Sequence, residues 1–252
     1  MARYELVCAD EFDTPGRPDP RKWTFEQGFI RNQELQWYQP ENAWCENSLL
    51  IIEARRERRP NPNHKSGSAD WMESRPQADY TSACLVTKGL QDWVYGRFEM
   101  RGRLDVRAGI WPAFWMMGGQ GEWPACGEID IMEFARGMLM ANAYWGSGIR
   151  WSPIGCVVKK ALSQFSDPEW ASKFHVWRLD WTRQQLKLYV DDQLLNRIYL
   201  RGTVNQDSER KNPFREPLYL ILNLAVGGFA GGDPSATEFP ARLEVDYVRV
   251  YQ

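Results

Sequence analysis

The sequence has few histidines, an odd number of cysteines and no long apolar run, and each of these features excludes some classes of protein. Two histidines occur in 252 residues, and GxSxG, P-loop, GxGxxG and HExxH motifs are missing, which argues against the common nucleophile, nucleotide and zinc-protease chemistries. Five cysteines without a CxxC pair argue against a zinc site or a disulfide framework. We expect the cysteines to be buried free thiols, with a single disulfide bond as the alternative. No run of about 18 apolar residues exists, so we expect no transmembrane helix.

The charge balance is also close to neutral. A net charge of −2 gives no electrostatic basis for binding nucleic acid or an anionic membrane. No secretory signal opens the sequence. Hydrophobic residues make up 43% of the chain, which is enough for a sizeable core. Because no linker or internal repeat divides the chain, we expect residues 1–252 to form one domain.

Helical periodicity is nearly absent, apart from a short turn near residues 167–174. Alternating and β-branched segments dominate instead, which favours an all-β fold: a sandwich or jelly roll whose antiparallel sheets can curve to form a cleft. The polar stretch 55–80 is too long for a plain connection and is interpreted as a groove-edge loop or a solvated loop. The expected strands lie in 48–57, 82–90, 95–105, 140–146, 174–182, 185–200, 218–228 and 243–252.

Tryptophan is the most conspicuous residue type, with 13 copies. A core rich in large aromatics accounts for some of them. Flat amphipathic rings also suit the apolar faces of pyranose sugars, so part of the set is a candidate lining for a groove. The candidates lie beside Gly, Pro and carboxylates where strands meet loops: Trp111, Trp115, Trp123, Trp145 and Trp151.

Three carboxylates lie within six residues of a segment that otherwise has the pattern of a buried strand, 127-GEIDIMEFA-135. Side chains at i and i+2 face the same way, so Glu128 and Asp130 share a face. Strict alternation would send Glu133 into the core, whereas one extra residue, a β-bulge, returns it to the face of Glu128. The spacing of two and then three therefore predicts a bulged strand with three aligned carboxylates. Its opposite face would carry Ile129, Ile131 and Phe134.

Three aligned carboxylates repel one another, so their pKa values must separate. This suits glycoside hydrolysis, in which one carboxylate attacks or stabilises and another donates a proton. The backbone spacing requires Glu128 and Glu133 to lean together, with Asp130 placed to hydrogen-bond Glu128. A calcium site or a solvated strand face is the alternative. Neither His64 nor His175 offers a rival centre, and His175, in strand-like FHVW, is expected to be a hydrogen-bonded core residue.

The sequence resembles glycoside hydrolase family 16, in the bulged branch that carries the E-x-D-x-x-E signature. The resemblance covers nearly the whole chain. It implies a jelly-roll β-sandwich with a sugar-binding cleft on its concave face, and endo-hydrolysis of β-linked polysaccharide with retention of configuration. Besides GEIDIME it rests on 10-DEFD-13, 32-NQELQWY-38, 80-YTSACLVTKG-89, 95-YGRFEMRGRL-104, 109-GIWPAFWMMGG-119, 174-FHVWRLDWT-182, 221-ILNLAVGG-228 and 245-VDYVRVYQ-252.

The resemblance also implies roles for individual residues. Glu128 matches the nucleophile, Glu133 the acid/base and Asp130 the assisting carboxylate. No cofactor is implied for catalysis. Trp145 stands where laminarinases of the family usually carry a histidine, and it is expected to contact substrate. Further substrate contacts are expected at Asn32, Arg97, Trp111, Trp115 and Trp123, and a structural calcium at Glu11 and Asp246.

The substrate expected first is β-1,3-glucan, which would make the protein a laminarinase-like endoglucanase. The missing histidine leaves room for an endo-β-galactosidase acting on poly-N-acetyllactosamine or another β-galactan. A non-catalytic carbohydrate-binding module is the alternative from another class, although it would not need three carboxylates. We expect a monomer whose partner is a glycan, located outside the cell, at its surface or in the periplasm.

Overall fold

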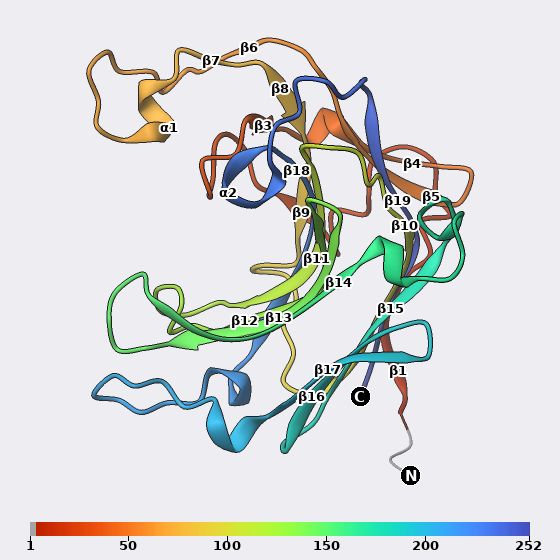
Figure 1. The fold of residues 1–252 in the computed structure, drawn as a ribbon, viewed down its shortest axis with the longest axis vertical. Coiled ribbons are helices and arrows are strands. Elements are labelled where there is room, and N and C mark those ends of the chain that lie inside the picture. Colours follow the sequence, from red (N-terminus) through yellow and green to blue (C-terminus); the bar gives the residue numbers. More distant parts are fainter. Residues whose placement is uncertain (1–3) are drawn as a thin grey trace.

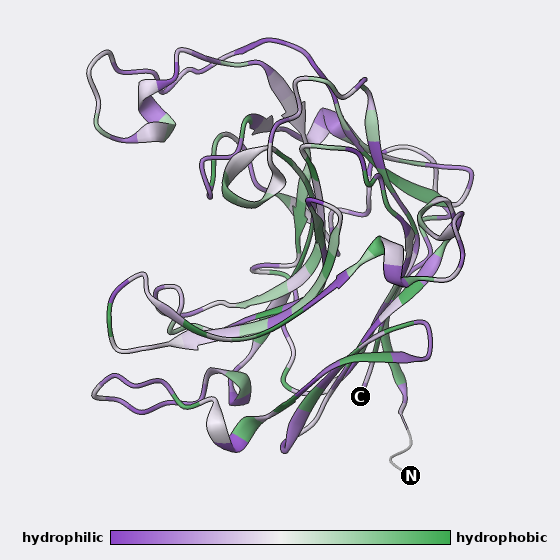
Figure 2. Ribbon diagram, in the orientation of Figure 1, coloured by the Kyte–Doolittle hydropathy of each residue, from purple (hydrophilic) through white to green (hydrophobic). Residues whose placement is uncertain are grey.

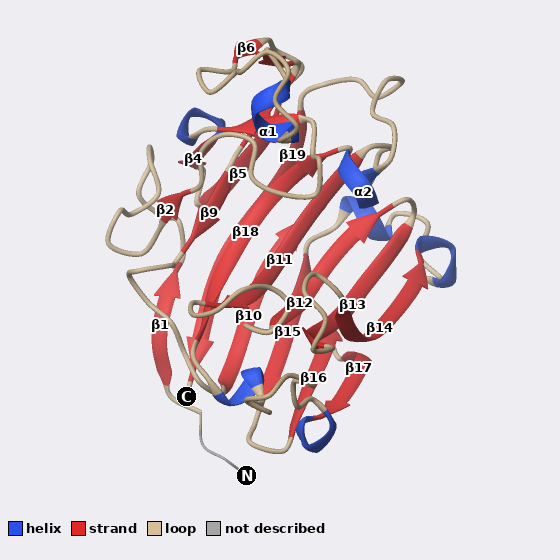
Figure 3. Cartoon of the chain, turned by 90° about the vertical axis from the view of Figure 1, so that its left-hand side faces the viewer, coloured by secondary structure: helices blue, strands red, loops and turns tan. Residues whose placement is uncertain are grey.

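The computed structural model describes residues 4–252, which form two antiparallel β-sheets packed face to face. We call the sheet that contains the acidic strand the front sheet, and its strands run in the order β14-β13-β12-β11-β18-β9-β2. Figure 1 shows that this sheet is strongly curved, and Figure 3 shows its strands side by side. The strands are β2 (Thr24–Phe25), β9 (Cys84–Val86), β11 (Ile110–Gly118), β12 (Glu128–Ala135), β13 (Met138–Gly146), β14 (Pro153–Ala161) and β18 (Leu218–Val226).

The second layer, which we call the back sheet, has the order β17-β16-β15-β10-β19-β5-β4, with β1 also paired to β19. Its strand β10 shows why the sequence folds this way, because Phe98 and Met100 are buried while the charged residues that alternate with them are only partly buried. The strands are β1 (Leu6–Asp10), β4 (Ala43–Glu46), β5 (Leu49–Ala54), β10 (Gly96–Arg103), β15 (His175–Trp181), β16 (Gln185–Val190), β17 (Gln193–Tyr199) and β19 (Ala241–Tyr251).

The main hydrophobic core lies between the two sheets. Phe98 and Trp177 of the back sheet and Phe114, Ile129 and Leu222 of the front sheet belong to one buried cluster. Figure 2 shows hydrophobic stretches on the strands of both sheets that enclose this layer, with polar stretches among them. The architecture confirms the expected all-β sandwich of two curved antiparallel sheets. It leaves the outer face of the front sheet free to carry polar groups.

Smaller elements surround the sandwich. An arm extends from β6 to β7 through the short helix α1, and Figure 1 shows it projecting on the side toward which the front sheet curves. Within the described part of the chain, no helix has the length and apolar character needed to cross a membrane. These elements are β3 (Gln36–Tyr38), β6 (Arg59–Pro60), α1 (Trp71–Ser74), β7 (Gln77–Ala78), β8 (Tyr80–Ser82), α2 (Gly228–Gly231) and the 3-10 turns Pro40–Asn42, Leu162–Gln164, Trp170–Ser172, Leu200–Gly202 and Pro213–Arg215.

Candidate active site

The acidic strand β12 carries the predicted bulge. Asp130 pairs with Asn142 and Glu133 with Met140, so Ile131 and Met132 together oppose the single residue Ala141. The same register shift appears against β11 on the other side. Strict alternation is thus broken once, between Asp130 and Glu133.

The bulge places the four large apolar residues of this segment in the core. Ile129, Ile131 and Met132 are fully buried and Phe134 is 1% exposed, and all belong to the cluster between the sheets. Gly127 immediately precedes the strand with a φ of 84°, and a Cβ there would approach Pro213 to 2.7 Å. The turn before Glu128 therefore requires glycine.

The three carboxylates share hydrogen-bond partners on the outer face of the front sheet. Asn142 Nδ2 donates to Asp130 Oδ2 at 3.1 Å and to Glu133 Oε2 at 3.2 Å. Asp130 also lies within hydrogen-bonding reach of both Glu128 and Glu133. Asp130 is 1% exposed, whereas the two glutamates keep part of their surface accessible. The strand therefore presents two reachable carboxyl groups joined by a buried third.

Burial is the main influence on the protonation of this group. It raises the pKa of Asp130 well above its usual range, and the charges of Glu133 and Glu128 add to the effect. Burial, then the charge of Glu133, raises the pKa of Glu128 to about 7, opposed by hydrogen bonds from Trp123 and Asp130. Burial also raises the pKa of Glu133, against hydrogen bonds from its neighbours. A protonated Asp130 can then donate its single O–H to one or the other of the two glutamates.

Two tryptophans donate directly to the reachable carboxylates. Trp111 Nε1 lies 3.0 Å from Glu133 Oε1, and Trp123 Nε1 lies 2.6 Å from Glu128 Oε2. Trp111 comes from β11, next to β12, and Trp123 from the loop that joins these strands. Each glutamate therefore has its own indole donor, which fixes its orientation and favours its ionised form.

Trp115 and Asn32, two further residues expected in the cleft, lie in different positions relative to the carboxylates. Trp115 pairs with Asp130 across β11 and β12, and its Nε1 donates to Asn223 at 2.7 Å. The guanidinium of Arg31 lies 5.2 Å from the Trp115 ring. Asn32 lies in the loop before β3, where its side chain donates to Glu34 and its carbonyl accepts from the backbone N–H of Phe229 in α2. Trp115 thus lies beside the carboxylates, and Asn32 lies in a loop beyond the end of β18.

Trp145 does not join the carboxylates. On β13 it has the parity of Ala141 and Ala143, and all three belong to the core cluster between the sheets. Its ring packs edge-on against Phe214 in that core. This corrects the expectation of a substrate contact, because adjacent strand residues face opposite ways.

The neighbouring Asn142 and Tyr144 are the residues that the sequence analysis missed. They pair with Asp130 and Glu128 and so share the carboxylate face. Burial and the three nearby carboxylates raise the pKa of the Tyr144 hydroxyl. The alternation in 140-MANAYWG-146, with alanines on one face and polar groups on the other, is the signal that could have found them.

Arg97 also lies away from the site. It is on β10 of the back sheet, where its side chain donates to Asp180 at 2.7 Å. The residues on either side, Gly96 and Phe98, are buried, so Arg97 faces outward on the opposite side of the sandwich. The expectation that it contacts sugar beside Glu128 is corrected by this position.

The two carboxylates expected to hold calcium are paired with arginines. Arg249 contacts Glu11 through two hydrogen bonds of 2.8 and 2.7 Å, and Arg101 donates to Asp246 at 2.6 Å. Among residues 4–252, no group of three or more His, Cys, Asp or Glu side chains is arranged to hold a metal ion. These residues therefore do not fit a shared calcium ion, since a fixed guanidinium already neutralises each carboxylate.

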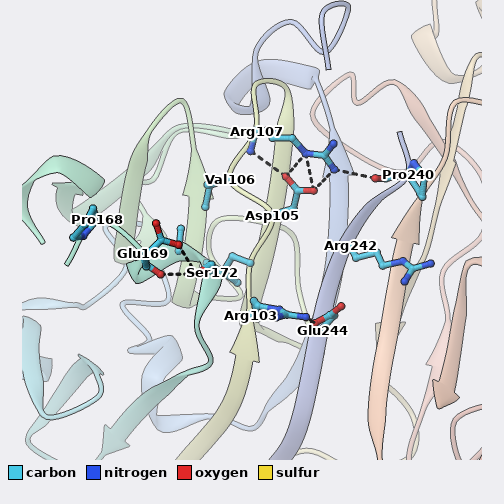
Figure 4. A pocket seen from close by; sticks show the side chains of 12 residues that line it. Arg103, Asp105, Val106, Arg107, Pro168, Glu169, Ser172, Pro240, Arg242 and Glu244 are labelled. Atoms are coloured by element: carbon cyan, nitrogen blue, oxygen red, sulfur yellow. Dashed lines mark hydrogen bonds and ion pairs between the residues drawn. The ribbon is translucent and has the colours of Figure 1, made fainter. Parts of the chain in front are cut away.

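The remaining sequence candidates are structural. All five cysteines are free thiols. His175 is buried, and its two ring nitrogens contact Asp191 and the Trp170 carbonyl, as expected for a hydrogen-bonded core residue. A cavity of ≈ 520 Å³ near Arg103 and Arg107 also lies apart from the acidic strand. Figure 4 shows two of its arginines already paired, Arg103 with Glu244 and Arg107 with Asp105.

Comparison with known proteins identifies the family. The sequence model of the family described as glycosyl hydrolases family 16 matches residues 37–249. The chain belongs to this family. A β-glucanase of Rhodothermus marinus is 39% identical over 99% of this chain and 85% of its own length. This match confirms the resemblance that the E-x-D-x-x-E signature indicated.

Solved family 16 structures share the fold over nearly the full chain. The laminarinase catalytic domain of Thermotoga maritima aligns with a TM-score of 0.81 and 35% identity, covering 99% of this chain and 98% of that one. A structure described among endo-acting O-glycanases, with which prominent human gut bacteria initiate mucin breakdown, aligns with a TM-score of 0.88 and 34% identity, covering 99% and 91%. The chain is thus a glycoside hydrolase with the family's jelly-roll sandwich.

Proposed function

We propose that this family 16 hydrolase is a retaining endo-β-1,3-glucanase, with residues 1–252 acting as one catalytic domain. The observation that carries the proposal is the bulged strand that holds Glu128 and Glu133 on one face, bridged by Asp130 and Asn142. The similarity to the Rhodothermus β-glucanase and the Thermotoga laminarinase supports the glucan substrate. The glycan reaches the enzyme outside the cytoplasm, and the enzyme works as a monomer.

The proposed mechanism uses carboxylates alone. Glu128 attacks the anomeric carbon as Glu133 protonates the departing glycosidic oxygen, which gives a covalent glycosyl-enzyme. Glu133 then removes a proton from water, which attacks the same carbon and releases Glu128. Asp130 donates a hydrogen bond to whichever glutamate carries more charge. The Nε1–H groups of Trp123 and Trp111 hold the two glutamates in place.

Glu128→Gln and Glu133→Gln test the assignment. Each should lower kcat on laminarin by at least about 10³-fold while the protein stays folded, because each removes an obligatory chemical role. Added azide should restore turnover to the Glu128→Gly variant by acting as an external nucleophile. Near-full activity of both glutamine variants would refute the proposed roles.

A second candidate substrate is a β-galactoside chain such as poly-N-acetyllactosamine. It is favoured by the TM-score of 0.88 to the O-glycanase structure and by the face of β13, where Asn142 and Tyr144 stand beside the carboxylates. Incubation with laminarin, lichenan, agarose and poly-N-acetyllactosamine, followed by mass spectrometry of the products, separates the two. Binding without any product would instead support a carbohydrate-binding module.

A further inference from the structure

The exposed ring of Trp151 is connected to the nucleophile through one other ring. Trp151 is 56% exposed and lies in the loop between β13 and β14. Its ring stacks on that of Trp123, with centroids 6.4 Å apart and planes inclined by 23°. Trp123 in turn donates its Nε1–H to Glu128. The two indoles therefore form a continuous aromatic surface that begins at Glu128 and ends in solvent.

The loop that carries Trp151 is held in place by several contacts. Trp151 itself has a φ of 60°, an unfavourable conformation for a bulky residue. Arg150 lies 5.2 Å from the Trp151 ring and makes two hydrogen bonds, of 2.8 and 2.7 Å, to Glu122 in the loop that also carries Trp123. Ser147 Oγ donates to the Ser152 carbonyl at 2.6 Å across the base of the loop. A large apolar ring is thus kept exposed by contacts that fix its orientation.

We infer that Trp151 and Trp123 form a stacking platform for a neutral pyranose unit of the substrate chain, outside the position where the bond is cleaved. An indole ring offers a flat apolar surface that matches the C–H face of a sugar. The charge of Arg150 is already neutralised by Glu122, so the platform presents no free cation to a sulfate or carboxylate group. The chemistry therefore favours an uncharged sugar over a sulfated one. This inference rests on the proposed function only in that the ligand is a β-linked glycan.

Chain-length dependence tests the platform. Wild type and Trp151→Ala are assayed for kcat/KM on laminari-oligosaccharides of three to six units and on poly-N-acetyllactosamine oligosaccharides of matching lengths. The variant should lose roughly three- to tenfold on the longest members of the series that is cleaved and should match wild type on the shortest. Trp151→Phe should retain most of the gain with length. Tyr199→Ala, which removes a ring that is 54% exposed on the back sheet, is the matched control and should change nothing.

A binding measurement keeps the outcome independent of turnover. Calorimetric titration of both oligosaccharide series into Glu128→Gln, with and without Trp151→Ala, should show weaker binding of the long members in the double variant. Binding without hydrolysis in wild type would contradict the proposed reaction but not the platform. Equal behaviour of Trp151→Ala and its parent at every length, an equal loss at every length, or no binding of either series would overturn the platform.

Discussion

At the scale of single residues, each of the two reachable glutamates has an indole donor of its own. Both sit in the same buried, crowded environment, which raises the pKa of each. A donor to a carboxylate stabilises the ionised form and lowers the pKa, so Trp123 opposes that rise at Glu128 and Trp111 at Glu133. Trp123 therefore supports the charge of the proposed nucleophile, and Trp111 limits how firmly the proposed acid holds its proton.

The two donors should control opposite limbs of the pH profile. In the proposed mechanism the acidic limb of kcat/KM reports protonation of Glu128 and the basic limb reports loss of the Glu133 proton, and burial raises the pKa of both groups. Trp123→Phe removes the donor to Glu128, so the acidic limb should move to higher pH. Trp111→Phe should move the basic limb to higher pH for the same reason. Trp115→Phe is the control, because the Trp115 indole donates to Asn223 and not to a glutamate. Movement of the wrong limb in either of the other two variants would contradict the assigned roles.

At the scale of elements, the bulge is what reconciles the spacing of the carboxylates with their common face. Ile131 is the extra residue, since removing it leaves Asp130, Met132 and Glu133 in strict alternation. Removing Ile129 instead would leave Glu128 adjacent to Asp130, which sends one carboxylate into the core. Both isoleucines are fully buried, so the two deletions remove equal apolar bulk.

Deletion of Ile131 should therefore be tolerated by the fold, and deletion of Ile129 should not. The Ile131 deletion should retain a cooperative transition and lose about 2–5 kcal/mol for the missing core side chain, while activity falls by about 10²-fold because the carboxylate spacing changes. The Ile129 deletion should lose the cooperative transition in urea, followed by near-ultraviolet circular dichroism. If both deletions destabilised the protein equally, the bulge would not determine which face of the strand Glu133 occupies.

How much of the site the sequence could predict depends on whether the pattern shows which face of its strand each residue occupies. The segment GEIDIMEFA predicts both the bulge and the face on which each side chain lies, because a regular strand would bury a carboxylate at a high cost in free energy. Trp145 was placed on the wrong face since an indole fits a groove and a core equally well. Tyr144, its neighbour, was missed for the same reason. Arg97 is a different case: its alternation with buried Phe98 is typical of an outward-facing residue, but nothing local to β10 indicates which of the two sheets the strand joins.

At the scale of the whole molecule, the two sheets put opposite demands on their outer faces. The front sheet gathers three carboxylates in one place, where they repel one another and form the proposed active site. The back sheet spreads alternating charges that neutralise one another: Arg97 with Asp180, Arg101 with Asp246, Arg103 with Glu244 and Arg249 with Glu11. Such partly exposed pairs typically stabilise a protein by at most about 1 kcal/mol each. Their consequence here is that Glu11 and Asp246 already have fixed positive partners.

Stability should accordingly be independent of calcium. A calcium ion at a hundred times its dissociation constant would add about 2.7 kcal/mol, enough to shift the melting temperature by several degrees in a chain of this size. We expect the melting temperature of the wild type to be the same in excess EDTA and in millimolar calcium chloride. Arg249→Gln should cost at most about 1 kcal/mol, since its pair with Glu11 is partly exposed. A clear rise in melting temperature with calcium in the wild type would mean that the arginine pairs open to admit the ion, and that the guanidinium groups do not take its place.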